Sequence, residues 1–131
     1  MRIGRRSVLA GWAAALAVWR ASKPNAQGIS PMYGLIGKML ATPGNRDTLV
    51  TLLLEGTAAM PGCLSYVIAT DPKDPDAIWI TEAWDSKASH DASLALSAVK
   101  AAIAKGRPLI AAFGSGTVTT PVGGHGLAAV R

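Results

Sequence analysis

Four side chains that could carry out proton chemistry, or bind a flat ligand, lie within a short stretch of the sequence. Tyr66 belongs to one apolar run, Glu82 and Trp84 belong to the next, and His90 follows shortly afterwards. An imidazole can act as a general base near neutral pH, and a phenol can donate a hydrogen bond to a bound oxygen. We therefore take His90, Tyr66 and Glu82 as candidate catalytic residues.

Three further residues are candidate contacts to a substrate. Trp84 offers a flat apolar wall for an aromatic ring, Trp79 lies on the same apolar run, and Ser93 lies near His90. The simpler interpretation of both tryptophans, and of Tyr66, is that they are core aromatics. The whole set indicates proton or electron chemistry on a small organic molecule.

Glu82 and His90 each have a structural alternative. Glu82 shares a strand face with two isoleucines at a period of two, so we do not expect it to be fully solvated. It could instead form a salt bridge to Lys38 or Arg107, or lie near the end of the strand. His90 could be a surface histidine, because on a continuous helix it falls nearly opposite the alanine-rich stripe that runs from Ala88 to Val99.

Several other chemistries lack their motifs. The sequence has no His, Cys and Asp set with zinc-ligand spacing, no Gly-x-Ser-x-Gly sequence and no P-loop. The Gly-Ser-Gly at 114–116 is too short for a dinucleotide-binding loop. The one cysteine, Cys63, begins an apolar run and is typical of a small buried hydrophobe. We expect neither a metal nor a cofactor.

The net charge of +5 belongs to the first residues of the chain. Five basic residues precede Gln27 without any acid, and the eight bases that remain are balanced by eight acids. A neutral domain has no basic surface for a phosphate backbone, so we do not expect nucleic acid as a partner.

The N-terminal residues resemble an export signal. A basic start, 1–6, precedes a short apolar run, 8–19, and Ala26 offers a small residue for cleavage. The paired Arg5 and Arg6 before an Ala-rich segment are typical of twin-arginine export, with an ordinary signal or an uncleaved anchor as the alternative. We expect a signal peptide at 1–26, a domain at 27–131, and a periplasmic or extracellular location.

The pattern after the signal predicts four strands and two helices. A first strand is expected at 32–40, two more at 63–69 and 78–84, and a last one at 117–122, before a flexible tail. One helix opens at Thr42-Pro43 and stops at Pro61-Gly62. The other begins after Ser86, runs to about Leu96 and continues, with or without a break, to 106.

This order, β-α-β-β-α-β, predicts an α+β ferredoxin-like fold with an antiparallel sheet. Helices normally cover only one face of such a sheet. The strand at 63–69 is apolar on both sides, with Tyr66 and Ile68 expected on one face and Cys63 and Val67 on the other. Pairing of the uncovered faces of two copies would bury them, so we expect a homodimer.

Several segments match one known family in order. They are Lys38, the Pro-Gly at 43–44, 61–66, 82–84, 89–94 and 121–124. Together they resemble the antibiotic biosynthesis monooxygenase family, particularly its small quinol monooxygenases, over 33–127. The resemblance implies a dimeric α+β barrel with a pocket between sheet and helices. It also implies oxygenation of quinols or polycyclic phenols by O2, without flavin, haem or metal.

The implied chemistry assigns roles to the candidate residues. His90 would act as the base or orient it, Tyr66 would donate a hydrogen bond, Trp84 would form the wall and Glu82 would tune His90 or the substrate. Haem-degrading relatives use an Asn, Trp and His set, and the first strand here has no Asn, so we do not expect haem degradation. Two alternatives remain: an acid–base isomerase, and a stress-response dimer that binds aromatic molecules without turnover.

Overall fold

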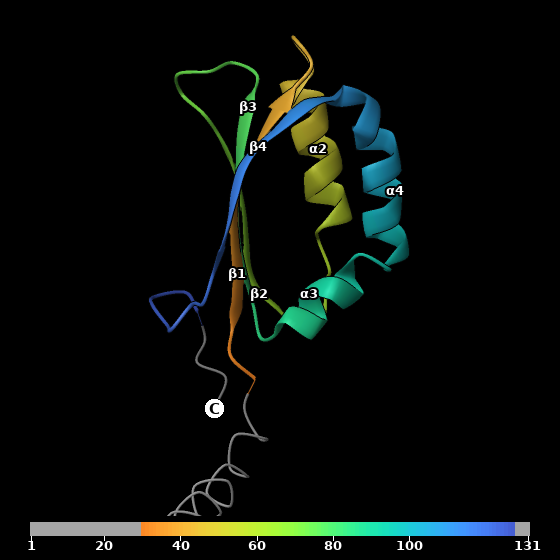
Figure 1. The fold of residues 1–131 in the computed structure, drawn as a ribbon. Helices are drawn as coiled ribbons and strands as arrows, with labels where there is room; N and C mark the ends of the chain where they lie inside the picture. The colour runs from red at the N-terminus through yellow and green to blue at the C-terminus, as the bar shows by residue number, and fades with distance from the viewer. Residues whose placement is uncertain (1–29, 128–131) are drawn as a thin grey trace, which may run out of the picture. The chain divides into compact units, whose positions relative to one another are not determined.

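The computed structural model describes residues 30–127, whose fold is shown in Figure 1. The predicted signal peptide, 1–26, lies outside the described residues. The elements are β1 (Tyr33–Ala41), α2 (Arg46–Gly56), β2 (Cys63–Thr70), β3 (Ala77–Trp84), α3 (Lys87–Ser93), α4 (Ser97–Gly106), the short 3-10 helix η2 (Arg107–Leu109) and β4 (Ile110–Thr119).

The four strands form one antiparallel sheet in the order β2-β3-β1-β4, so the first and third strands lie in the middle. The helices all pack on one side of this sheet (Figure 1). We call that side the helix face and the other side the bare face. The predicted β-α-β-β-α-β order and the ferredoxin-like α+β fold are confirmed.

The hydrophobic core lies between α2 and the helix face. Leu49 of α2 and Ile78 of β3 are completely buried, and Ala41 at the end of β1 packs with them. Leu53 and Ile80, one helical turn and one strand repeat further on, pack against this cluster. The apolar residues of α2, spaced by 3.6, and those of β3, spaced by two, therefore pack in a single core. This packing determines which side of β3 faces the helices.

The first helix starts later than predicted. Thr42-Pro43 does not open it: the Thr42 hydroxyl accepts a hydrogen bond of 2.8 Å from the Asn45 side-chain amide, and α2 begins at Arg46. Gly44 has a φ of 78°, which is a turn conformation and not a helical one. The chain therefore makes a turn first, and the capping signal in the sequence belongs to that turn.

The last strand is longer than predicted. β4 runs from Ile110 to Thr119, whereas the sequence predicted a strand at 117–122, so the strand both starts and ends earlier than predicted. It pairs with β1 from Ala41 opposite Ile110 to Gly34 opposite Thr119. Its first half is rich in Ala, Gly and Ser, and nearly all of β4 is exposed because it is an edge strand. An edge strand that is exposed on both sides needs no apolar alternation, so the pattern missed it.

The second predicted helix is divided in two. Ser86 caps α3 as predicted, because its side chain accepts a hydrogen bond from the Ser89 backbone N–H. Leu96 then takes an extended conformation, with φ −66° and ψ 137°, and α4 starts anew at Ser97. His90 therefore lies on a short helix of its own. Among residues 30–127, no helix is long and apolar enough to cross a membrane.

A bulge near the start of β2 changes which residues share a face. Cys63 pairs with Trp84, but the next pair is Ser65 with Ala83, so Leu64 has no partner on β3. As a result, Cys63 lies on the helix face together with Tyr66. The prediction that placed Cys63 on the face of Val67 is wrong, because regular alternation cannot include an extra residue.

The contact between α2 and α4 depends on a glycine. A Cβ on Gly56 would overlap the Cβ of Ala102 and lie 3.3 Å from the carbonyl oxygen of Ala98. We expect Gly56→Ala to lower the free energy of unfolding by about 1–3 kcal/mol, because the helices must separate. Gly37→Ala is the matched control, since a Cβ there meets nothing within 4 Å. Urea unfolding followed by circular dichroism compares them, and equal midpoints would contradict the argument.

Candidate active site

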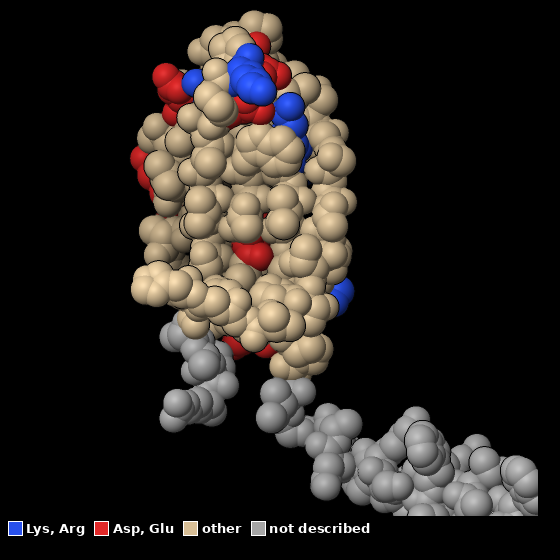
Figure 2. Space-filling view, turned by 90° about the vertical axis from the view of Figure 1, so that its left-hand side faces the viewer, with Lys and Arg blue, Asp and Glu red and all other residues tan. Residues whose placement is uncertain are grey.

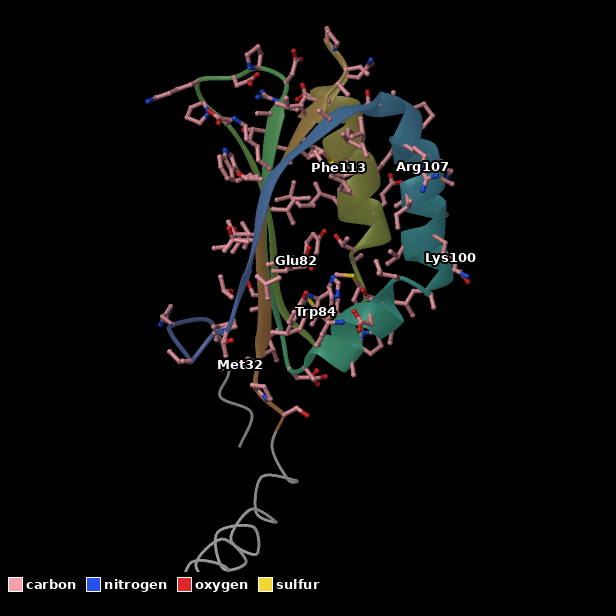
Figure 3. The ribbon with its side chains drawn as sticks, in the orientation of Figure 1. Met32, Glu82, Trp84, Lys100, Arg107 and Phe113 are labelled. Carbon is pink, nitrogen blue, oxygen red and sulfur yellow. The ribbon has the colours of Figure 1, made fainter. Side chains whose placement is uncertain are left out.

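The three predicted catalytic residues come together on the helix face. In the strand register, Glu82 of β3 lies between Tyr66 of β2 and Leu35 of β1. Trp84, two residues further along β3, points to the same side as Glu82, and Figure 3 shows both side chains projecting from the sheet toward the helices. α3 follows β3 after a short turn and places the His90 ring 5.5 Å from that of Trp84.

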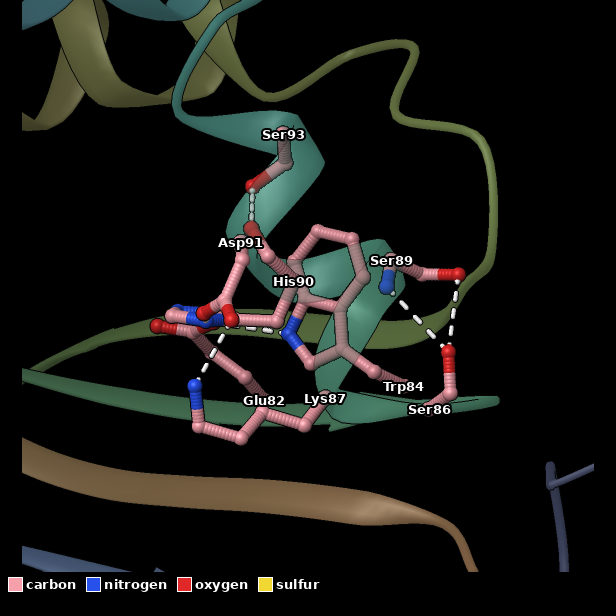
Figure 4. Close-up of polar contacts among 8 residues, drawn as sticks. All are labelled: Glu82, Trp84, Ser86, Lys87, Ser89, His90, Asp91 and Ser93. Carbon is pink, nitrogen blue, oxygen red and sulfur yellow. Dashed lines mark hydrogen bonds and ion pairs between the residues drawn. The ribbon is translucent and has the colours of Figure 1, made fainter. Parts of the chain in front are cut away.

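Glu82 is held by the residue next to it on the same side of the strand. Its Oε2 accepts a hydrogen bond of 2.8 Å from the Trp84 indole N–H and lies 3.9 Å from Nε2 of His90 (Figure 4). The side chains of His90 and Glu82 are only 16% and 14% exposed. Trp84 is 1% exposed, so its ring is enclosed by protein while its N–H positions the carboxylate.

Two aromatic rings enclose the imidazole. The Tyr33 ring lies 5.1 Å from the His90 ring at a tilt of 47°, and the Trp84 ring meets it edge-on at 83°. Tyr33 is at the start of β1, directly opposite Trp84. Contacts with β1 and β3 therefore fix the plane of the imidazole, and its Nε2 faces the carboxylate of Glu82.

The two ring nitrogens of His90 face different carboxylates. Nδ1 lies 3.2 Å from Oδ1 of Asp91, and Oδ2 of Asp91 accepts a hydrogen bond of 2.6 Å from the Lys87 ammonium. Lys87 also lies 6.0 Å from the centre of the Tyr33 ring. Hydrogen bonds from Lys87 and His90 hold the pKa of the Asp91 carboxyl below its usual range, and the bond from Lys87 is the larger cause.

Tyr66 and Cys63 are in a less polar setting. Burial raises the pKa of the Tyr66 phenol well above its ordinary value, and the nearby Glu82 carboxylate raises it further. Burial also raises the pKa of the Cys63 thiol, with a smaller contribution in the same direction from Glu82. Both groups are therefore protonated near neutral pH, so Tyr66 is available as a hydrogen-bond donor.

The predicted substrate contacts are not all in one place. Ser93 lies on α3 with His90 but is 5% exposed, and its hydroxyl donates a hydrogen bond of 2.6 Å to the His90 backbone carbonyl. Trp79 lies on the bare face, where its indole N–H donates to Asp71 and Lys38 stands over its ring. The structure therefore brings Ser93 to His90 but separates Trp79 from the other candidates.

Neither cation considered as a partner of Glu82 is paired with it. Lys38 lies on the bare face, 3.8 Å from Asp71. Arg107 follows the end of α4 in the outer layer, away from Glu82 (Figure 3). The polar contacts of Glu82 are instead with Trp84 and His90.

Three residues of this cluster were not predicted from the sequence. No sequence pattern indicates that Tyr33 belongs to the site, because only the register of β1 against β3 brings it to His90. Lys87 and Asp91 do show a pattern: they are four residues apart on a helix, a spacing typical of ion pairs, and Asp91 follows His90 directly. Their importance depends on the orientation of His90, which the sequence does not reveal.

The cluster can move a proton and stabilise an oxygen anion. It holds a half-buried imidazole between two carboxylates and a neutral phenol on the neighbouring strand. A base with a fixed orientation and a hydrogen-bond donor are the parts that phenol deprotonation requires. Within 30–127, no three His, Cys, Asp or Glu side chains are grouped so as to hold a metal ion.

The raised pKa of Tyr66 has a consequence for stability. The folded state holds the phenolic proton more tightly than the unfolded chain does, so the free energy of unfolding must fall as pH rises above about 10, where an ordinary tyrosine ionises. We expect Tyr66→Phe to reduce this alkaline loss and Tyr33→Phe to retain it. Urea titrations between about pH 9 and 11 measure the difference. Equal slopes in both variants would show that Tyr66 is not the group responsible.

Fold and site define a class: a ferredoxin-like α+β domain with an acid–base cluster between sheet and helices. The sequence model of the family described as antibiotic biosynthesis monooxygenase matches residues 32–105. The chain belongs to this family. No functionally curated protein matches it significantly.

Solved structures agree with this assignment. One, described as a putative antibiotic biosynthesis monooxygenase from Chloroflexus aurantiacus J-10-fl, is 68% identical, with a TM-score of 0.73 over 74% of this chain and 99% of that one. A protein of Nitrosomonas europaea with the same description is 13% identical, with a TM-score of 0.65 over 71% and 92% of the two chains. A conserved protein of Methanosarcina mazei Go1 is 16% identical, with a TM-score of 0.60 over 69% and 92%. The latter two share the fold alone.

Proposed function

We propose that the protein is a cofactor-independent monooxygenase that oxidises a quinol or polycyclic phenol with O2. The observation that carries this proposal is the half-buried His90, held between Glu82 and Asp91 and packed against two aromatic rings. Membership of a family named for monooxygenases supports the reaction class. The neutral phenol of Tyr66 supports the binding of an anionic oxygen.

In the proposed reaction, His90 removes the proton of a substrate hydroxyl and leaves an electron-rich anion. That anion passes an electron to O2, and the two radicals combine to form a carbon–oxygen bond. His90 returns its proton to the resulting peroxide, and loss of water then gives the product: a quinol and O2 become a hydroxyquinone and H2O. Both reducing equivalents come from the substrate, so the balance requires no other reductant. The protein contributes the base, a donor to the anion and exclusion of water.

Oxygen uptake by the purified protein tests the reaction. With a panel of hydroquinones and anthrones and no added cofactor, we expect consumption of one O2 for each molecule of oxygenated product, a hydroxyquinone from a quinol or a quinone from an anthrone. Rearrangement of a substrate without O2 uptake would indicate the isomerase instead. Saturable binding of the aromatic compounds with neither uptake nor rearrangement would indicate a binding protein, and either result would refute the monooxygenase proposal.

We further propose that the functional unit is a homodimer formed through the bare face. Large apolar side chains are exposed there, with Ile36, Val67 and Trp79 at 42%, 50% and 37%. Figure 2 shows this face with few charged residues over its middle and most of them gathered at one end. A hollow of about 290 Å³ lies on it, lined by residues that include Ile36, Thr81 and Pro121. An exposed apolar sheet face of this kind is typical of a protein–protein interface.

A charge on the bare face tests the dimer. Val67→Asp should weaken self-association at least about 100-fold, since about 3 kcal/mol is a modest cost for an unpaired charge in an apolar interface. Leu54→Asp is the matched control, because Leu54 is 56% exposed on α2, on the opposite side of the molecule. Sedimentation equilibrium gives both association constants. Equal constants would exclude the bare face as the interface.

We also propose that a twin-arginine signal at 1–26 directs export of the protein. The basic start with Arg5 and Arg6 supports a twin-arginine signal and a periplasmic or extracellular location. Replacing both arginines with lysine should retain the protein inside the cell, whereas replacing Arg20 should not. Secretion that is unaffected by the paired change would refute the twin-arginine route.

A further inference from the structure

The side chains around His90 restrict where its proton can be. The titratable or charged groups that face the ring are Tyr33 from β1, Glu82 from β3, and Lys87 and Asp91 from α3 itself. Of the two carboxylates, Asp91 is the closer, with Oδ1 3.2 Å from Nδ1, whereas Oε2 of Glu82 lies 3.9 Å from Nε2. Only the first contact is within hydrogen-bond range.

A carboxylate can only accept a hydrogen bond. The Asp91 contact therefore requires the proton on Nδ1. In the opposite tautomer, the Nδ1 lone pair would face the Asp91 oxygen, and the N–H would point toward Glu82 across the longer distance. Oε2 of Glu82 already accepts the Trp84 N–H at 2.8 Å, so it is a weaker acceptor for a second hydrogen bond. Both contacts favour Nδ1–H and leave the lone pair on Nε2.

Asp91 is itself held in place. Its second oxygen accepts a hydrogen bond of 2.6 Å from Lys87, one helical turn earlier on α3. The Lys87 and Asp91 side chains are 66% and 52% exposed, and their ion pair engages Oδ2 of Asp91 while Oδ1 faces the ring. The same Lys87 lies against the Tyr33 ring, which packs on the imidazole. Ring, carboxylate and ammonium are therefore oriented as one group.

We propose that Asp91 is a positioning residue that holds the proton of neutral His90 on Nδ1, so that Nε2 presents its lone pair to the substrate. This inference rests on the proposed function for its catalytic meaning, but not for the tautomer itself. The substrate proton would then be received at Nε2, beside Glu82, while the Nδ1–H bond to Asp91 stabilises the imidazolium. Lys87 acts one step further away, through Asp91.

Nitrogen NMR of the imidazoles tests the tautomer without any activity assay. The chain has only two histidines, so His125 serves as an internal reference for His90. At about pH 8.5, where an ordinary imidazole is neutral, wild type should show a protonated Nδ1 at His90. Asp91→Ala should move this proton to Nε2, the site that free histidine prefers. Asp91→Asn retains an oxygen acceptor and should keep the proton on Nδ1.

Kinetics then measure the effect on catalysis. Asp91→Ala should lower kcat for quinol oxidation by at least about tenfold with little change in KM, within the 10²- to 10⁴-fold that a general base supplies. Glu55→Ala removes an exposed carboxylate from α2 and should leave both the tautomer and the rate unchanged. Thermal unfolding establishes that each variant is folded.

The outcomes separate this inference from the proposed function. A proton on Nε2 in wild type, or one that stays on Nδ1 in Asp91→Ala, overturns the positioning role even if the protein consumes O2. A proton that moves in Asp91→Ala, in a protein that oxidises no quinol, supports the positioning role and refutes the monooxygenase. A moved proton together with a lower kcat supports both.

Discussion

His90→Ala should lower kcat for O2 consumption by about 10²- to 10⁴-fold, the range that a well-placed general base provides. The imidazole is the proposed proton acceptor, and its Nε2 faces the helix side of the sheet beside Glu82. KM should change less, because the proposed role of the imidazole is to accept the proton and not to bind the aromatic ring of the substrate. An oxygen electrode with a saturating quinol gives the rate.

Two controls make this result specific. His125→Ala removes the other histidine, which lies after β4 and outside the cluster, and should leave the rate unchanged. Added imidazole should restore part of the rate to His90→Ala, because it can enter the space left by the ring and accept the proton. Full activity without rescue would remove His90 from the mechanism, and a loss that imidazole does not restore would favour a structural role.

Glu82→Gln should lower kcat by about 10- to 100-fold, which corresponds to about 1.4–2.8 kcal/mol in the activation barrier. When His90 takes up the substrate proton, its positive charge lies 3.9 Å from the Glu82 carboxylate. At an effective dielectric constant of about 20, such a pair is worth about 4 kcal/mol, and solvent makes this an upper bound. The expected loss is a fraction of that value.

The amide is chosen because it changes charge and little else. The glutamine carbonyl can still accept the Trp84 indole N–H, so that buried donor is not left without a partner. Glu55→Gln, on the outside of α2, is the matched control for removing a negative charge. If the two variants retain the same kcat, Glu82 does not stabilise the protonated base, and its role is to orient Trp84.

Most of the fold could be predicted because its central elements are strongly periodic. Ile78 and Ile80 of β3 alternate clearly, and Leu49 and Leu53 mark the buried side of α2, so both were found. Prediction failed where local rules differ from the global structure. β4 lacks a pattern because it is an exposed edge, and Leu64 is an extra residue that no alternation can accommodate.

The sequence indicated which residues could form the candidate site, but not how most of them are arranged. Glu82 and Trp84 could be paired from their spacing on one strand, and His90 was found by its chemistry. The neighbours of His90 could not be derived, because the break before α4 frees α3 from the helix on which that prediction was based. Only the register of β1 against β3 reveals that Tyr33 stands opposite Trp84. Long-range pairing of this kind leaves no mark in the local sequence.

The bulge in β2 turns the one sulfhydryl of the protein toward the interior of the candidate site. Cys63 lies opposite Trp84, and it is close enough to Glu82 for that carboxylate to raise the pKa of its thiol. A maleimide reagent should therefore modify the chain at a single place, slowly at neutral pH because the raised pKa of the thiol leaves little thiolate. Occupancy by an aromatic compound would slow labelling further. The rate at which Cys63 is labelled can therefore be used to screen for ligands of the site without an activity assay.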